Sequence, residues 1–128
     1  MRYLLLICSE HEPPATLDDE NINWDEQEAN VEPWLRETSD VRLLSSRLAV
    51  PADATTVRVR DGKVLYSDGP FAETKEWIAG IDLIECADLD EAIEIASKHP
   101  VASFGKIEVR PLHPEVWREK RPYPGKLM

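Results

Sequence analysis

The sequence predicts an α+β fold in which two helices pack against an antiparallel β-sheet. Three observations predict it: short apolar runs alternate with two segments of helical spacing, a hairpin signal lies mid-chain, and one helix start carries a capping pattern. The 128 residues have the length of one domain. With 42% hydrophobic and 31% charged residues, the composition is that of an ordinary globular protein.

The first third of the chain predicts a strand, a helix and a second strand. Residues 3–8 form a continuous apolar run, which is typical of a strand covered on both faces. A helix is expected over residues 24–38, and Pro33 must either kink it or open a second turn. Residues 41–50 predict the next strand. The helix is indicated by four residues at helical spacing: Trp24, Val31, Trp34 and Leu35.

The middle of the chain carries the clearest local signal. Residues 56–60 and 63–66 partly alternate between apolar and polar side chains, and Asp61-Gly62 between them suits a turn with positive φ. We therefore expect a β-hairpin. The loop that follows, residues 68–76, combines two backbone breakers, an aromatic ring and several charges, which favours a shaped loop at a sheet edge over a plain connection.

The last third predicts a strand, a helix and a final strand. Residues 77–86 form the first of these strands. Asp88 is the expected N-cap of the helix, with Glu91 completing a capping box, and Pro100 ends the helix. Residues 107–110 form the final strand. The expected buried stripe of the helix consists of Leu89, Ala92, Ile93 and Ala96.

This order of elements corresponds to a ferredoxin-like sandwich with an inserted β-hairpin. Helices cover only one face of such a sheet. If the strands are apolar on both faces, the second face needs a cover, and a second copy of the chain is the simplest one. We expect a homodimer of stacked sheets, built from a domain over residues 1–111. The remaining residues 112–128 form a Pro-rich C-terminal arm, which is expected either to pack on a neighbour or to be partly disordered.

The net charge of −10 is concentrated in one segment. Between residues 10 and 40, eleven acidic residues face a single base, Arg36, so this segment accounts for the whole net charge. Nucleic-acid affinity depends on Lys and Arg neutralising phosphates, so we expect no nucleic-acid partner. The acidic surface is interpreted either as a solvated helix face or as a docking surface.

Nothing in the chain predicts export or membrane insertion. The apolar run after Met1 is too short for a signal peptide, and Glu10 and Glu12 follow it at once. No apolar stretch approaches the roughly 20 residues of a membrane helix. Cys8 and Cys86 lie in apolar strand-like runs, which indicates buried free thiols in a reducing compartment. We expect a cytoplasmic protein that binds no membrane.

The sequence contains no recognisable metal or cofactor motif. His11, His99 and His113 have no metal-ligand spacing, and the two cysteines lack the Cys-x-x-Cys spacing of a redox pair. The five glycines are not clustered into a phosphate-binding loop. We therefore predict no cofactor and no metal.

Residues 68–76, Asp-Gly-Pro-Phe-Ala-Glu-Thr-Lys-Glu, resemble the DGPF-motif branch of the YCII-related domain family. The resemblance implies a dimeric α/β barrel in which two ferredoxin-like sheets face each other around a cleft. The same superfamily holds isomerases, monooxygenases and haem enzymes, so it implies no particular reaction. Further segments match in order: residues 3–7, 55–64, 87–92 and 107–111.

The chain departs from the family pattern at two places. For the broader family, the resemblance implies an acid–base pair of a His and an Asp in the dimer cleft. Asp68 occupies the acid position, but residues 20–40, where the His is expected, contain no histidine. Where the DGPF branch usually has Gly-Phe-Tyr-Leu-Ile, residues 80–84 read Gly-Ile-Asp-Leu-Ile, so that an aromatic pair has become an aliphatic residue and an acid.

Asp82 and Asp68 are the candidate catalytic residues. By strand alternation Asp82 shares a face with Ile84 and Cys86. If that face points to a partner copy, a carboxylate lines the cleft and Arg110 is available as charge partner and ligand-binding residue; the alternative is a structural ion pair or an exposed edge position. Asp68 is either a general acid or base, or an acid that hydrogen-bonds its own turn.

The remaining candidate ligand-binding residues lie in the loop after Asp68. Phe71 is expected to anchor this loop, while Glu73 and Lys75 are placed to close over a ligand. The leading hypothesis is a small cytoplasmic homodimer with a cleft that binds, and in its stronger form transforms, a small organic molecule. The alternative is a non-catalytic regulatory or interaction protein associated with a sigma-factor system, which docks through the acidic segment or the basic tail. Whether the chain is an enzyme, and of what reaction, is left open.

Overall fold

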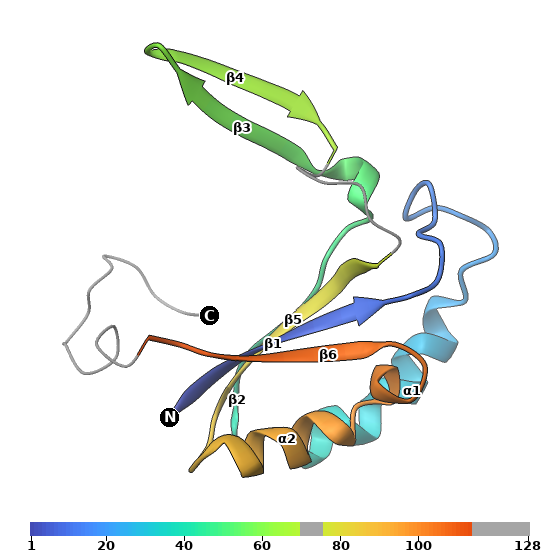
Figure 1. Cartoon of the computed structure of the whole chain (residues 1–128). Coiled ribbons are helices and arrows are strands. Elements are labelled where there is room, and N and C mark those ends of the chain that lie inside the picture. Colours follow the sequence, from blue (N-terminus) through green and yellow to red (C-terminus); the bar gives the residue numbers. More distant parts are fainter. Residues whose placement is uncertain (70–75, 114–128) are drawn as a thin grey trace.

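A computed structural model of the chain describes residues 1–69 and 76–113. Four strands form an antiparallel sheet in the order β2-β5-β1-β6, and two more strands pair separately as a hairpin (Figure 1). The elements are β1 (Arg2–Ser9), α1 (Trp24–Glu37), β2 (Arg42–Arg47), β3 (Thr55–Arg60), β4 (Lys63–Asp68), β5 (Trp77–Glu85), α2 (Leu89–Ser97) and β6 (Lys106–Pro111), with short 3₁₀ turns η1 (Pro51–Asp53) and η2 (Pro100–Ser103).

Both helices lie on the same side of the four-stranded sheet (Figure 1). The core between the helices and the sheet is built from buried side chains of β1, β5, α1 and α2, among them Leu5, Ile84, Trp34 and Ala92. The architecture is therefore α+β and consistent with the expected ferredoxin-like fold, with the elements in the predicted order. The stacking of two such sheets into a barrel stays a prediction.

Helix α1 is capped at both ends by side chains. Asn23 accepts a hydrogen bond from the backbone N–H of Glu26 at 3.0 Å, which satisfies one of the donors that a helix start leaves unpaired. At the other end, the Arg42 guanidinium donates to the carbonyl of Leu35 at 2.7 Å. The helix runs through Pro33 to Glu37, so this proline does not open a second helix.

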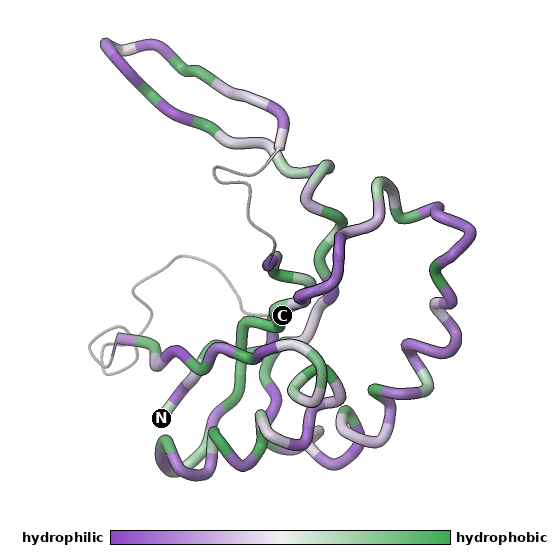
Figure 2. The backbone as a smooth tube through the Cα atoms, turned by 45° about the vertical axis from the view of Figure 1, so that its right-hand side comes forward, coloured by the Kyte–Doolittle hydropathy of each residue, from purple (hydrophilic) through white to green (hydrophobic). Residues whose placement is uncertain are grey.

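The hairpin β3–β4 forms as predicted. Asp61 and Gly62 have φ of 53° and 73°, the positive values that a tight two-residue turn of this hand requires. The hairpin stands away from the four-stranded sheet, with polar and apolar residues alternating along it (Figure 2). Cross-strand pairing places four exposed apolar side chains on one of its faces: Val57, Val59, Val64 and Tyr66.

Two sequence expectations need correction. The strand predicted to reach residue 50 ends at Arg47, and the chain then leads into the 3₁₀ turn at Pro51, whose missing N–H cannot continue a ladder. The buried stripe of α2 consists of Ala92 and Ala96, whereas two larger predicted members, Leu89 and Ile93, are about half exposed. The short side chains allow α2 to lie close to the sheet.

The cap of α2 forms largely as expected. The Asp88 carboxylate accepts from the backbone N–H of Glu91 at 3.0 Å, while the Glu91 side chain accepts from the N–H of Ala87 rather than from that of Asp88.

Within the described residues, neither helix has the length and apolar character needed to cross a membrane.

Candidate functional site

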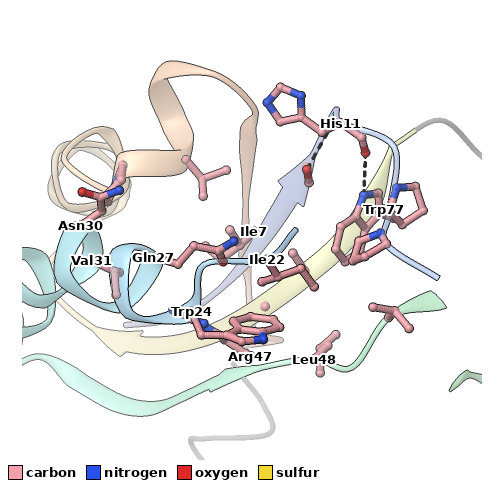
Figure 3. Close-up of a pocket in the computed structure, with 18 of the residues that line it drawn as sticks. Ile7, His11, Ile22, Trp24, Gln27, Asn30, Val31, Arg47, Leu48 and Trp77 are labelled. Carbon is pink, nitrogen blue, oxygen red and sulfur yellow. Dashed lines mark hydrogen bonds between the residues drawn. The ribbon is translucent and has the colours of Figure 1, made fainter. Parts of the chain in front are cut away.

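A hollow of about 980 Å³ lies on the helix-covered side of the sheet, between α1, the segment that joins β1 to α1, and strands β2 and β5. Figure 3 shows Trp24 and Gln27 of α1, Arg47 at the end of β2 and Trp77 at the start of β5 placed around this hollow. The turn η2 adds a further wall with Phe104 just after it. The hollow has the size and the mixed aromatic and polar lining of a small-molecule site.

The segment between β1 and α1 is held in place by two indole groups. Trp24 donates from Nε1 to the carbonyl of Leu17 at 3.2 Å, and Trp77 donates to the carbonyl of His11 at 2.8 Å. At its start, Lys106 of β6 contacts Glu10 at 3.5 Å. The acidic, Pro-containing stretch that the sequence predicts to be a loop thus forms one wall of the hollow.

Asp82 is the buried acid of this hollow. It is only 4% exposed, and its Oδ1 atom has no hydrogen-bond partner. Burial raises the pKa of the carboxyl to about 6, although the Ser45 hydroxyl and the Arg42 guanidinium act in the opposite direction. An unpaired buried carboxylate oxygen is rare in proteins and needs an explanation, since an isolated buried charge costs several kcal/mol.

The strand register decides which face Asp82 occupies. Asp82 is paired with Leu5 of β1, which is fully buried beneath the helices, so Asp82 faces the helices as well. Arg110 is paired with the neighbouring residue, Leu4, and therefore lies on the opposite face, where it contacts Glu108. The structure corrects the expectation that Asp82 faces a partner copy with Arg110 beside it.

His99 is a second titratable group in the hollow, and the sequence reasoning did not single it out. Its Nδ1 accepts a hydrogen bond from the N–H of Val101 at 3.1 Å, so the neutral ring carries its proton on Nε2. The ring meets that of Trp34 edge to face, with centroids 4.7 Å apart. Burial lowers the pKa of His99 to about 4, which keeps the ring neutral at ordinary pH.

His99 and Trp34 were missed for a simple reason. A histidine immediately before a proline reads as the end of a helix, and Trp34 reads as an ordinary core residue. They are 65 positions apart, and no spacing pattern links them. The sequence does contain a histidine, an acid within a strand and aromatic residues on a helix. A single sequence does not show that these three features come together in the fold.

The other predicted site residues lie elsewhere. Asp68 ends β4 on the exposed hairpin and is not among the residues that line the hollow. Phe71, Glu73 and Lys75 lie outside the described residues, so their roles stay predictions. The catalytic pair Asp68 and Asp82 is thus not assembled within the hollow.

The surfaces of the regulatory hypothesis are only partly described. The acidic segment contains α1 and forms one wall of the hollow, whereas the basic part of the tail lies outside the described residues.

Cys8 and Cys86 are free thiols, and of the two only Cys86 is buried. Among the described residues, no group of three or more His, Cys, Asp or Glu side chains could hold a metal ion.

Comparison with known proteins identifies relatives but no reaction. An uncharacterised protein of Rhizobium meliloti (strain 1021) is 48% identical over 69 residues, which are 52% of this chain and 56% of that protein. The chain therefore spans little more than half the length of this relative. The model of the YCII-related domain matches residues 1–116. On this match, which takes in every helix and strand described above, the chain belongs to the YCII-related domain family.

Proposed function

We propose that the chain binds a small organic molecule in the hollow beside α1, with Asp82 as the polar group that holds it. One observation carries the proposal: Asp82, which is 4% exposed, lines a hollow of about 980 Å³, and its buried Oδ1 has no hydrogen-bond partner. Buried polar atoms in native proteins almost always have partners. A ligand that donates a hydrogen bond to Oδ1 supplies the missing one.

The same carboxyl is suited to acid–base chemistry. A general acid or base works best when its pKa lies near the working pH, and burial brings the pKa of Asp82 to about 6. His99 is another member of the lining, and its ring is neutral because burial lowers its pKa to about 4. If the bound molecule is transformed, Asp82 is the group that moves the proton, and His99 helps to position the substrate.

The binding proposal is tested with a chemically diverse fragment library. A ligand at about a hundred times its Kd adds about 2.7 kcal/mol to the free energy of unfolding, which raises Tm by several degrees. We expect such shifts for the parent chain and their loss in Asp82→Asn. Asp68→Asn is the matched control, since that acid lies on the hairpin, and should keep the shifts. A library in which no compound raises Tm would contradict the proposal.

We further propose that the chain works as a homodimer. The register that turns Leu5 toward the helices turns Leu4 and Leu6 to the other face of the sheet, together with Ile81, and no described helix covers that face. The hairpin adds an apolar face that is exposed, that of Val57, Val59, Val64 and Tyr66. An isolated two-stranded hairpin is marginally stable in water, so burial against another chain gives it support.

The dimer is tested by light scattering of the parent chain and of a hairpin variant. The parent should have twice the 14.6 kDa mass of one chain. Val59→Lys combined with Val64→Glu places opposite charges across the hairpin, which keeps the strands paired but removes the apolar face. This variant should dissociate at least tenfold more readily, whereas Leu65→Glu, opposite Arg58 on the other face, should not. A monomeric parent at micromolar concentration would refute the dimer.

A further inference from the structure

The charged side chains around the hollow are mostly acidic. Three carboxylates line its outer part, those of Glu12, Asp19 and Glu28, and Asp82 lies within. Arg47 is the single Lys or Arg among the described lining residues. Glu12, Asp19 and Glu28 form no ion pair within the described part of the chain. The potential in the hollow is therefore negative, which attracts cations and repels anions.

The aromatic walls offer ring surface rather than hydrogen-bond donors. Three tryptophans line the hollow, and each uses its indole N–H on a backbone carbonyl. Trp24 donates to Leu17 and Trp77 to His11, while Trp34 donates to Ile95 at 2.9 Å. With their donors occupied, the indoles of Trp24 and Trp77 present to a ligand the π surfaces that bind apolar groups and cations, whereas the Trp34 ring, which is 3% exposed, belongs to the core.

One of these rings already holds a cation of the protein itself. The guanidinium carbon of Arg47 lies 5.1 Å from the centre of a Trp24 ring, within the range of a cation–π contact. Trp24 is 37% exposed, so water reaches this part of the wall. The wall thus provides the kind of contact that a cationic ligand makes.

The inner end of the hollow lacks what a cation supplies. Oδ1 of Asp82 has no donor, and the Ser45 hydroxyl and Arg42 guanidinium do not offset its burial. An ammonium group brings both a positive charge and several N–H donors to such an oxygen. A neutral donor brings only the hydrogen bond, and an anion brings neither.

We infer that the hollow takes a small organic amine in its protonated form, with the ammonium group at Asp82 and the apolar body against the tryptophan rings. The inference rests on the proposed function, because it names the ligand class of the same site. The inference is narrower than the proposed function. A hollow that binds neutral molecules or anions would agree with the proposed function but would contradict the inference.

Three probes with the same phenyl group separate these cases. Isothermal titration of the full chain at pH 7.5 compares 2-phenylethylamine, 2-phenylethanol and 3-phenylpropionate, which carry a cation, a neutral hydroxyl and an anion. The amine should bind at least about tenfold more tightly than the alcohol, because charged hydrogen bonds are about twice as strong as neutral ones. The carboxylate should bind most weakly.

Two variants test whether Asp82 causes a preference for the amine over the alcohol. Asp82→Asn should lower the affinity for the amine about tenfold and leave that for the alcohol nearly unchanged. Glu94→Gln is the matched control: it removes one negative charge from α2, outside the lining, and should leave the amine affinity within about twofold. A preference that survives Asp82→Asn would overturn the inference.

The remaining outcomes distinguish the two proposals. If the alcohol or the carboxylate binds as tightly as the amine, the inference is wrong while binding of a small molecule in the hollow stands. If none of the three binds and the fragment library also gives no shift, both fail. Equal weakening of amine and alcohol by Asp82→Asn would show that the acid only shapes the hollow, and would likewise overturn the inference.

Discussion

At pH 8 the Asp82→Asn chain should unfold with a free energy about 3 kcal/mol higher than that of the parent. The pKa of this carboxyl is about 6 in the folded chain against an ordinary value of 3.8, because burial disfavours the charged form. Each pH unit between these values corresponds to about 1.36 kcal/mol. Asparagine resembles the neutral carboxyl in shape and removes the cost of burying the charge.

The sign of the effect sets its pH window. Since folding raises the pKa of Asp82, its favourable contribution is complete below pH 3.8 and is lost as the pH rises to about 6. The gain from Asp82→Asn should therefore be small at pH 4 and level off above about pH 6. Urea unfolding at a series of pH values measures it.

His99 titrates in the opposite sense. Folding lowers its pKa from 6.5 to about 4, so its favourable contribution is present above pH 6.5 and is lost as the pH falls to about 4. In the parent chain the two groups offset each other between about pH 4 and 6. Asp82→Asn should expose a rise of stability with pH in this window, and His99→Gln a fall. If the Asp82→Asn chain is only as stable as the parent at pH 8, the conclusion that burial raises the pKa of Asp82 is wrong.

The stability that Asp82 costs is itself an argument for function. A residue that destabilises the fold at neutral pH, in a position where a neutral side chain of the same shape is available, is typical of binding and catalytic sites. The proposal therefore expects one substitution to move two properties in opposite directions. Asp82→Asn should raise stability and remove ligand binding.

Trp34→Ala should lower the free energy of unfolding by about 3–5 kcal/mol, the usual range for deleting a buried tryptophan. The side chain is 3% exposed, packs edge to face against His99 and hydrogen-bonds the carbonyl of Ile95. Its removal opens a cavity and leaves that carbonyl without its indole donor. Denaturant unfolding at pH 7 gives the difference directly.

Trp24→Ala provides the matched control on the same helix. Trp24 is 37% exposed at the opening of the hollow, so its loss should lower the free energy of unfolding by only about 1 kcal/mol. It should nevertheless weaken ligand binding, because its ring forms part of the wall. Equal losses of stability for Trp24 and Trp34 would contradict the division of α1 into a core end and a binding end.

Local features of the fold were predictable because their causes are local. The turn at Asp61-Gly62 follows from the backbone freedom of those two residues, and the start of α2 follows from the side chain of Asp88. The order of strands and helices follows from hydrophobic spacing over a few residues. The same reasoning failed for the end of β2, where the strand stops three residues before the expected boundary.

The candidate site was only partly predictable. The sequence singled out Asp82 as an unexpected acid in a strand and placed it correctly on the face of Ile84. It did not connect Asp82 with His99 and Trp34, which line the same hollow only once α1 and the turn after α2 pack on the sheet. Contacts between distant segments leave no periodic trace in one sequence.

By itself, the sequence determined the succession of elements, the hairpin turn, the N-cap of α2 and the division of each strand into two alternating sides. Only the tertiary structure decided which side of β5 the helices cover, because alternation separates the two faces of a strand without saying which of them is inside. That choice places the Asp82 carboxylate in a hollow within one chain and Arg110 on the far face. The physical reason is that the covered face is selected by the packing of whole helices, a property of the assembled core and not of any short segment.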